Sequence, residues 1–75
     1  MFSKEIFAAR VLALRRGKNL NQQQLGETVG ITQTMVTRIE KGERAASIEV
    51  MCLLADYFEV SLDYLVGRSE ISERR

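Results

Sequence analysis

The sequence predicts an all-α domain of five short helices. Its apolar residues recur three and four positions apart along most of the chain, which is the period of a helix with one buried face. No stretch alternates apolar and polar residues in the manner of a half-buried strand. The chain contains no proline, no internal repeat and no low-complexity linker, and its 75 residues suffice for one domain only.

The first helix is predicted over about residues 3–16, with Ser3 as its N-cap. Three apolar residues lie on one stripe of this helix: Phe7, Val11 and Leu14. The segment that follows, GKNLN, has the composition of a loop. We expect Leu20 in this loop to fold back against the core.

The second and third helices are short and lie close together in the sequence. Asn21 can cap the second helix, predicted over about residues 22–29, and Gly30 can end it because a positive φ costs glycine little. Thr32 can then cap a third helix over about residues 33–40. Two helices joined so tightly predict a helix-turn-helix, in which a small residue, Gly26, would stand at the helix crossing.

The predicted third helix has two contrasting faces. Its apolar side holds Met35, Val36 and Ile39. Its opposite side is a continuous polar arc of four residues: Gln33, Thr34, Thr37 and Arg38. This arc is either an ordinary solvated face or a surface that hydrogen-bonds a flat, edge-on target.

The C-terminal part of the chain predicts two further helices. Ser47 can cap one over about residues 48–58, and Ser61 can cap a short one over about residues 62–66. Gly67 would end this last helix. We therefore assign residues 1–67 to the domain and residues 68–75 to a polar C-terminal tail, which we expect to fray.

The helix predicted over about residues 48–58 is apolar almost all round. Its inner arc is expected to hold Ile48, Met51, Cys52, Leu54, Ala55 and Phe58. A second apolar stripe would remain in water, and such stripes usually mark an interface. We expect an isologous dimer contact made by Val50, Leu53, Tyr57, Tyr64 and Ile71. The alternative is that the last helix or the tail covers the stripe within one chain.

Several classes of function are disfavoured by the composition. The chain has no histidine and only one cysteine, Cys52, which we expect to be buried, so neither a metal site nor an enzyme is indicated. No cofactor is expected. There is no apolar run of about 18 residues and no signal peptide, which predicts a cytoplasmic protein without a membrane partner.

Charge is distributed unevenly along the chain. Residues 10–44 contain seven basic and three acidic residues, a net charge of +4, whereas residues 45–75 contain three basic and six acidic residues, a net charge of −3. This asymmetry indicates a polyanion as the partner of the first part. For Arg10 and Lys18, a DNA contact and a purely solubilising role are both left open.

Two segments of the sequence resemble one known family. NQQQLGETVGITQTMVTRIEKGER and SIEVMCLLADYFEVSLDYLVG are similar to the lambda-repressor-like (Cro/C1, or XRE) helix-turn-helix family over about residues 7–67. The resemblance implies a compact five-helix domain that binds a palindromic DNA operator as a homodimer. Small proteins of this family, bacterial or phage-encoded, include phage repressors, controller proteins and antitoxins, and the sequence does not separate them.

The resemblance also implies roles for individual residues. Bases in the major groove would be contacted by Gln33, Thr34, Thr37 and Arg38, with Gln33 suited to adenine and Arg38 to guanine. Phosphates would be contacted by Asn21, Gln22, Thr32, Lys41, Gly42 and Arg44. Gln22 would also brace Gln33. Arg15 and Glu40 would form a structural salt bridge between the first and third helices.

Two alternatives accompany these roles. Lys41 and Arg44 could simply keep the protein soluble. The whole chain could instead be an antitoxin or anti-repressor type module that binds a protein partner through its apolar C-terminal surface. The sequence also departs from the family pattern, with Gly26 in place of a usual alanine and Glu59 in place of a usual glycine, so Glu59 is expected to adopt a positive φ.

Overall fold

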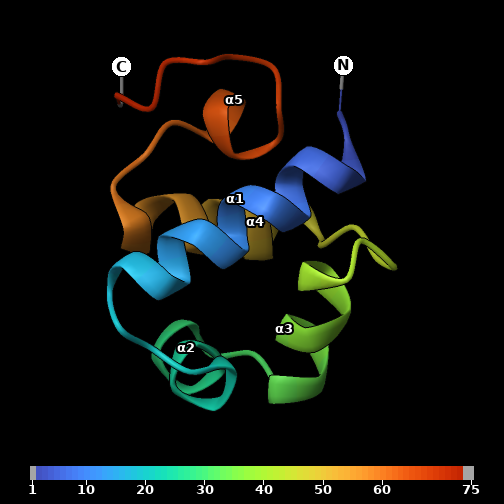
Figure 1. Cartoon of the computed structure of the whole chain (residues 1–75), viewed down its shortest axis with the longest axis vertical. Helices are drawn as coiled ribbons and strands as arrows, with labels where there is room; N and C mark the ends of the chain where they lie inside the picture. The colour runs from blue at the N-terminus through green and yellow to red at the C-terminus, as the bar shows by residue number, and fades with distance from the viewer. Residues whose placement is uncertain (1, 74–75) are drawn as a thin grey trace.

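The computed structural model describes residues 2–73, and these residues form five helices and no strand. The helices are α1 (Lys4–Gly17), α2 (Gln22–Val29), α3 (Gln33–Glu40), α4 (Ile48–Phe58) and α5 (Leu62–Leu65). The all-α class and the number of helices are confirmed. Figure 1 shows α1 and α4 crossing in the middle of the molecule, with α2 and α3 at one end and α5 at the other. No helix in residues 2–73 is long and apolar enough to cross a membrane.

Each helix begins at a predicted N-cap. The capping side chain accepts a hydrogen bond from the amide three residues further on, which satisfies one of the free N–H groups of the first turn. The five caps are Ser3, Asn21, Thr32, Ser47 and Ser61. At α2 the bond is reciprocal, because the Gln24 side chain also accepts from the Asn21 amide at 2.9 Å. The sequence therefore locates all five helix starts through local chemistry.

Two helices end where the backbone adopts a left-handed conformation. Gly30 ends α2 with a φ of 82°, and Glu59 ends α4 with a φ of 56°, the positive value expected of it. The last helix is one residue shorter than predicted, because Val66 is its C-cap. α1 extends one residue further than predicted, to Gly17.

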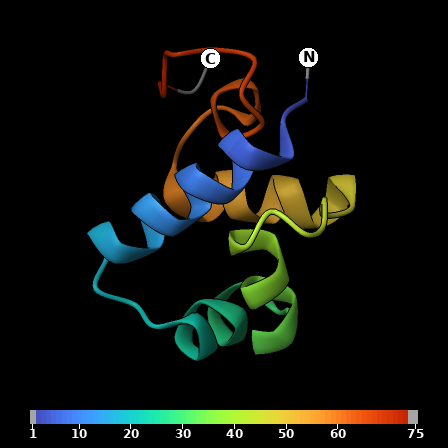
Figure 2. The ribbon, with the colours of Figure 1, turned by 45° about the vertical axis from the view of Figure 1, so that its right-hand side comes forward.

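One core joins all five helices. Each helix contributes a side chain that is at most 1% exposed: Phe7, Leu25, Ile39, Leu54 and Leu65. Leu14 and Leu20 pack against this core, as expected. Figure 2, turned from the first view, shows α1 lying across α4 while the α2–α3 pair projects below them. The core thus holds α3 against α1 and α2 and leaves one side of α3 outside.

The predicted rotation of α4 is partly wrong. Ile48 is 62% exposed and Cys52 is also exposed, although both were expected on the inner arc. Val50 and Tyr57, expected on the outer stripe, pack partly against the core. A helix that is apolar on every side does not indicate which flank is covered. Here Lys18 covers the Tyr57 flank, with its Nζ 5.0 Å from the ring centroid.

The C-terminal segment, which we expected to fray, contacts the rest of the domain as far as Ser72. The guanidinium of Arg10 donates to the carbonyl oxygens of Tyr64 and Ser69, the latter at 2.7 Å, and pairs with Glu70 at 3.1 Å. It also lies 4.0 Å from the centroid of the Tyr64 ring. The Ser61 amide donates to the carbonyl of Ser72 at 2.9 Å. Residues 74 and 75 of the predicted tail lie outside the described residues.

Gly26 generates the first testable prediction. A Cβ at this position would lie 2.7 Å from the backbone oxygen of Ile31, closer than packed atoms tolerate. Alanine normally stabilises a helix interior relative to glycine by about 1 kcal/mol. At this site we expect Gly26→Ala to lower the free energy of unfolding by about 1–3 kcal/mol instead, measured by urea denaturation.

Gly17→Ala is the matched control. Gly17 is also helical, but a Cβ there would meet nothing within 4 Å. Its substitution should leave stability unchanged or raise it. A Gly26→Ala variant as stable as the control would show that the α2–α3 crossing has room for a side chain.

Candidate nucleic-acid interface

The turn between α2 and α3 is held by one backbone oxygen. The carbonyl of Gly26 accepts hydrogen bonds from the amides of Gly30 at 2.8 Å and Ile31 at 2.9 Å. Thr32 then opens α3, its hydroxyl accepting from the Met35 amide at 3.1 Å. These short-range hydrogen bonds constrain every residue between the two helices. The turn therefore sets the direction of α3 relative to α2.

The two faces of α3 are occupied as predicted. Val36 and Ile39 are each 1% exposed and belong to the core. Gln33, Thr34 and Arg38 are exposed. Within residues 2–73 the side chains of these three residues make no hydrogen bond or ion pair, so their donors and acceptors are available to a ligand. Thr37 belongs to the same arc but is partly covered.

A salt bridge anchors the C-terminal end of α3 to α1. Arg15 Nε lies 2.6 Å from Glu40 Oε2, and Arg15 Nη2 lies 3.0 Å from Glu40 Oε1. The side chains are only 11% and 5% exposed. Arg15 Nη1 also donates to the carbonyl of Leu20 at 2.7 Å, which ties down the loop after α1. The hydrogen bond to Glu40 raises the pKa of Arg15 and outweighs the opposing effect of burial, so the guanidinium stays charged.

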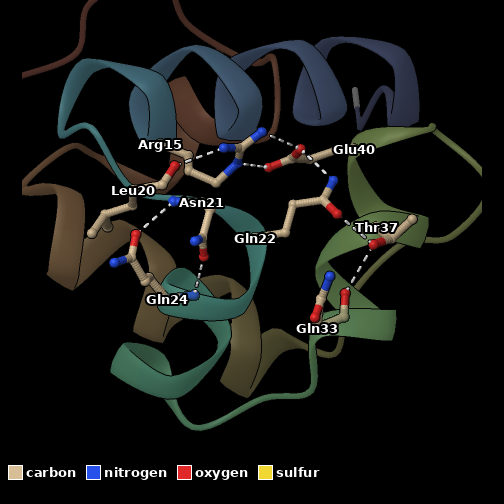
Figure 3. A network of polar contacts seen from close by, with 8 residues as sticks. All are labelled: Arg15, Leu20, Asn21, Gln22, Gln24, Gln33, Thr37 and Glu40. Carbon is tan, nitrogen blue, oxygen red and sulfur yellow. Dashed lines mark hydrogen bonds and ion pairs between the residues drawn. The ribbon is translucent and has the colours of Figure 1, made fainter.

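Gln22 extends this salt bridge into a network across three helices, drawn in Figure 3. Its Nε2 donates to Glu40 Oε1 at 3.0 Å, and its Oε1 accepts from the Thr37 hydroxyl at 2.7 Å. The resemblance implied that Gln22 braces Gln33, whereas its amide bonds to Glu40 and Thr37 in this structure. Glu40 holds the amide nitrogen of Gln22, so its oxygen is directed at Thr37, one turn beyond Gln33.

The residues expected at phosphates fall into two groups. Asn21 and Thr32 use a side-chain oxygen to cap their helices, while the Asn21 amide hydrogens and the Thr32 hydroxyl hydrogen stay available as donors. Lys41 and Arg44 are exposed and follow directly after α3, on either side of Gly42, which has a φ of 73°. Both ends of the α2–α3 unit therefore carry donors.

The role of Arg10 could not be found from sequence spacing. The sequence allows Arg10 to contact DNA, but its guanidinium is occupied by Tyr64, Ser69 and Glu70. These partners are 54 to 60 residues away in the sequence. No pattern among neighbouring residues in the sequence predicts a contact between residues so far apart. Arg10 fastens the C-terminal segment to α1 and is not a free positive charge.

Comparison with known proteins identifies the family. A family model described as helix-turn-helix matches residues 11–65. The chain is 31% identical over 72 residues to the control protein C.SmaI of Serratia marcescens, covering 96% of this chain and 86% of the relative. It is 32% identical over 66 residues to the cryptic phage CTXphi transcriptional repressor RstR of Vibrio cholerae, covering 88% of this chain and 59% of that protein. The chain belongs to the helix-turn-helix family of the lambda-repressor-like (Cro/C1) type.

The fold has a counterpart among solved structures. It superposes with a TM-score of 0.80 and 25% identity on the P22 c2 repressor, in a crystal structure with synthetic operator 9T and Tl⁺, covering 85% of this chain and 97% of that one. Several curated relatives are longer proteins. The chain spans 32% of one transcriptional activator and 53% of one transcriptional regulator that it matches.

The buried ion pair generates the second prediction. Arg15→Met removes one charge and leaves Glu40 buried, so we expect the free energy of unfolding to fall by about 3 kcal/mol in urea denaturation. Arg16→Met is the matched control, because Arg16 is exposed and adjacent, and it should change stability by less than about 0.5 kcal/mol.

A double variant separates the lost salt bridge from the unpaired charge. Arg15→Met with Glu40→Leu removes both charges, and apolar replacement of a buried pair is often close to neutral. The double variant should therefore regain most of the stability that the single variant loses. Losses that simply add up would contradict a coupled, buried pair.

Proposed function

We propose that the chain is a sequence-specific DNA-binding transcriptional regulator of the repressor type. The observation that carries the proposal is the contrast between the two sides of α3. One side is fixed by the core and by the Glu40 network, while the other presents the side chains of Gln33, Thr34 and Arg38, which make no hydrogen bond or ion pair within residues 2–73. Recognition of base edges requires this combination of fixed position and free hydrogen-bonding groups.

In this proposal α3 lies in the major groove. Gln33 has the donor and acceptor to pair with the N6 and N7 atoms of adenine, and Arg38 has the paired donors suited to the O6 and N7 atoms of guanine. Thr34 and Thr37 line the groove between them. Donors at the starts of α2 and α3 and just after α3 hold the DNA backbone: Asn21, Gln22, Thr32, Lys41 and Arg44. The amide of Gly42, expected at a phosphate as well, already donates to the carbonyl of Ile39 at 3.0 Å.

The comparisons support this assignment. The two relatives reported above are named a control protein and a phage transcriptional repressor. The similar P22 repressor is described together with an operator. A regulator that binds an operator needs a free polar face, and α3 provides one.

The regulator is proposed to act as a homodimer on a palindromic operator. One recognition helix reads only a few base pairs, whereas two related by a twofold axis read half-sites about 34 Å apart. The dimer contact is centred on Leu53, which is 47% exposed, with Ile71 at 49%. The other proposed members, Val50, Tyr57 and Tyr64, pack partly on their own core and offer only their outer edges.

The second candidate function is a module that binds a protein partner. Ile48 and Leu53 on α4 favour it, since both are large, apolar and exposed. It leaves the polar arc of α3 without a purpose, and for this reason we favour DNA binding. The two functions differ in what a substitution on α3 would do.

Arg38→Ala and Lys41→Ala form the test of DNA binding. Arg38→Ala should weaken binding to a duplex selected by the protein from a random library by about 1–3 kcal/mol, with preference lost at one base position. Lys41→Ala should weaken all duplexes alike and reduce the slope of log affinity against log salt by about one unit. Fluorescence anisotropy over a salt series measures both effects.

The two variants serve as controls for each other. If Arg38→Ala reduced affinity equally for every sequence, Arg38 would be a phosphate contact. If neither variant changed DNA binding, and both variants still bound a protein partner of the wild type, the second candidate function would replace the first.

Leu53→Glu tests the dimer. A carboxylate at the centre of an apolar contact should dissociate it, giving the sedimentation coefficient of a monomer in analytical ultracentrifugation. Ala13→Glu adds the same charge at an exposed position of α1 outside the proposed contact and should leave the dimer intact. A folded Leu53→Glu protein that sediments like the wild type would remove Leu53 from the interface.

A further inference from the structure

The hydroxyl of Thr37 lies between two hydrogen-bond acceptors of its own chain. Thr37 Oγ1 is 2.7 Å from Gln22 Oε1 and 3.0 Å from the carbonyl oxygen of Gln33 (Figure 3). A threonine hydroxyl has one hydrogen to donate and two lone pairs with which to accept. The direction of that hydrogen decides what Thr37 can offer to a ligand.

The orientation of the Gln22 amide is fixed by its other neighbour. Glu40 is paired with Arg15, and an ionised carboxylate can only accept hydrogen bonds. The group of Gln22 that lies 3.0 Å from Glu40 must therefore be its NH₂ group, because an amide oxygen there would face another acceptor. The amide oxygen is then left facing Thr37, and it too can only accept.

Since both neighbours of the Thr37 hydroxyl are acceptors, its hydrogen is held inside the protein. Only lone pairs remain on the side that faces outward. On the proposed function, with α3 in the major groove, we propose that Thr37 reads DNA as an acceptor only. It selects the exocyclic amino group of adenine or cytosine at its position and disfavours the O6 of guanine and the O4 of thymine, which offer no hydrogen.

Thr34 lies on the same polar arc and provides the contrast. Its side chain is exposed and makes no hydrogen bond within residues 2–73. Its hydroxyl can rotate to donate or to accept. Two threonines three residues apart thus differ in what they specify, and the difference arises from Gln22 and Glu40 rather than from the threonines themselves.

The experiment combines Thr37→Val with the removal of single amino groups from bases of the DNA. In the duplex selected from a random library, each adenine is replaced in turn by purine, which lacks the 6-amino group, and each cytosine by pyrimidin-2-one, which lacks the 4-amino group. At one position of each half-site, removing the amino group should weaken wild-type binding by about three- to tenfold. The same removal should have no effect on the Thr37→Val protein.

Two further variants keep the result interpretable. Thr37→Ser retains the hydroxyl and should retain the response, which guards against a fold defect in Thr37→Val. Thr34→Val should leave the response at the Thr37 position unchanged. The acceptor assignment is overturned if the removal of no amino group couples to Thr37→Val.

Failure of the proposed function would look different. If the wild-type protein bound the selected and scrambled duplexes equally, sequence reading itself would be absent and the assignment of Thr37 would fall with it. Clear discrimination between these duplexes without coupling at Thr37 would overturn the acceptor assignment alone.

Discussion

Glu40, the last residue of α3, accepts three hydrogen bonds where three helices meet: two from Arg15 of α1 and one from Gln22 of α2. Its side chain is 5% exposed, so the carboxylate is stable only because each of these donors is in place. The same contacts set the orientation of Gln22, and through Gln22 that of the Thr37 hydroxyl. The buried carboxylate of Glu40 therefore determines what Thr37 can offer on the outer face of α3.

The position of α3 depends on a second constraint, the absence of a side chain at Gly26. The backbone oxygen of Ile31 occupies the space that a Cβ would need. Together, Gly26 and Glu40 fix the two ends of α3, one through close packing and the other through charge.

The parts of the fold that depend on neighbouring residues could be predicted from the sequence. The five N-caps were all located, because each arises from a side chain and the backbone within a few residues. The positive φ of Glu59 was expected only through the family resemblance. The rotation of α4 could not be predicted in full, since apolar residues surround it and periodicity gives no preferred side. The wrong expectation that Cys52 is buried follows from that ambiguity.

Contacts between distant residues were equally out of reach. Arg10 holds the C-terminal segment through partners more than fifty residues away, and no spacing rule connects them. The bonds of Gln22 to Glu40 and Thr37 were not predicted for a related reason, because they depend on where Glu40 lies in space. The Arg15–Glu40 pair itself was expected only through family resemblance. Local chemistry thus indicated which face of α3 is polar, and tertiary structure determines what that face can donate or accept.

The most direct measurement is the affinity of the protein for DNA selected from a random library, compared with a scrambled duplex of the same composition. Fluorescence anisotropy at about 0.15 M salt keeps the non-specific electrostatic contribution at a physiological level. If the outer face of α3 reads base edges, the selected duplex should bind about 10³-fold or more tightly than the scrambled one. Equal affinity for the two duplexes would contradict sequence recognition by this protein.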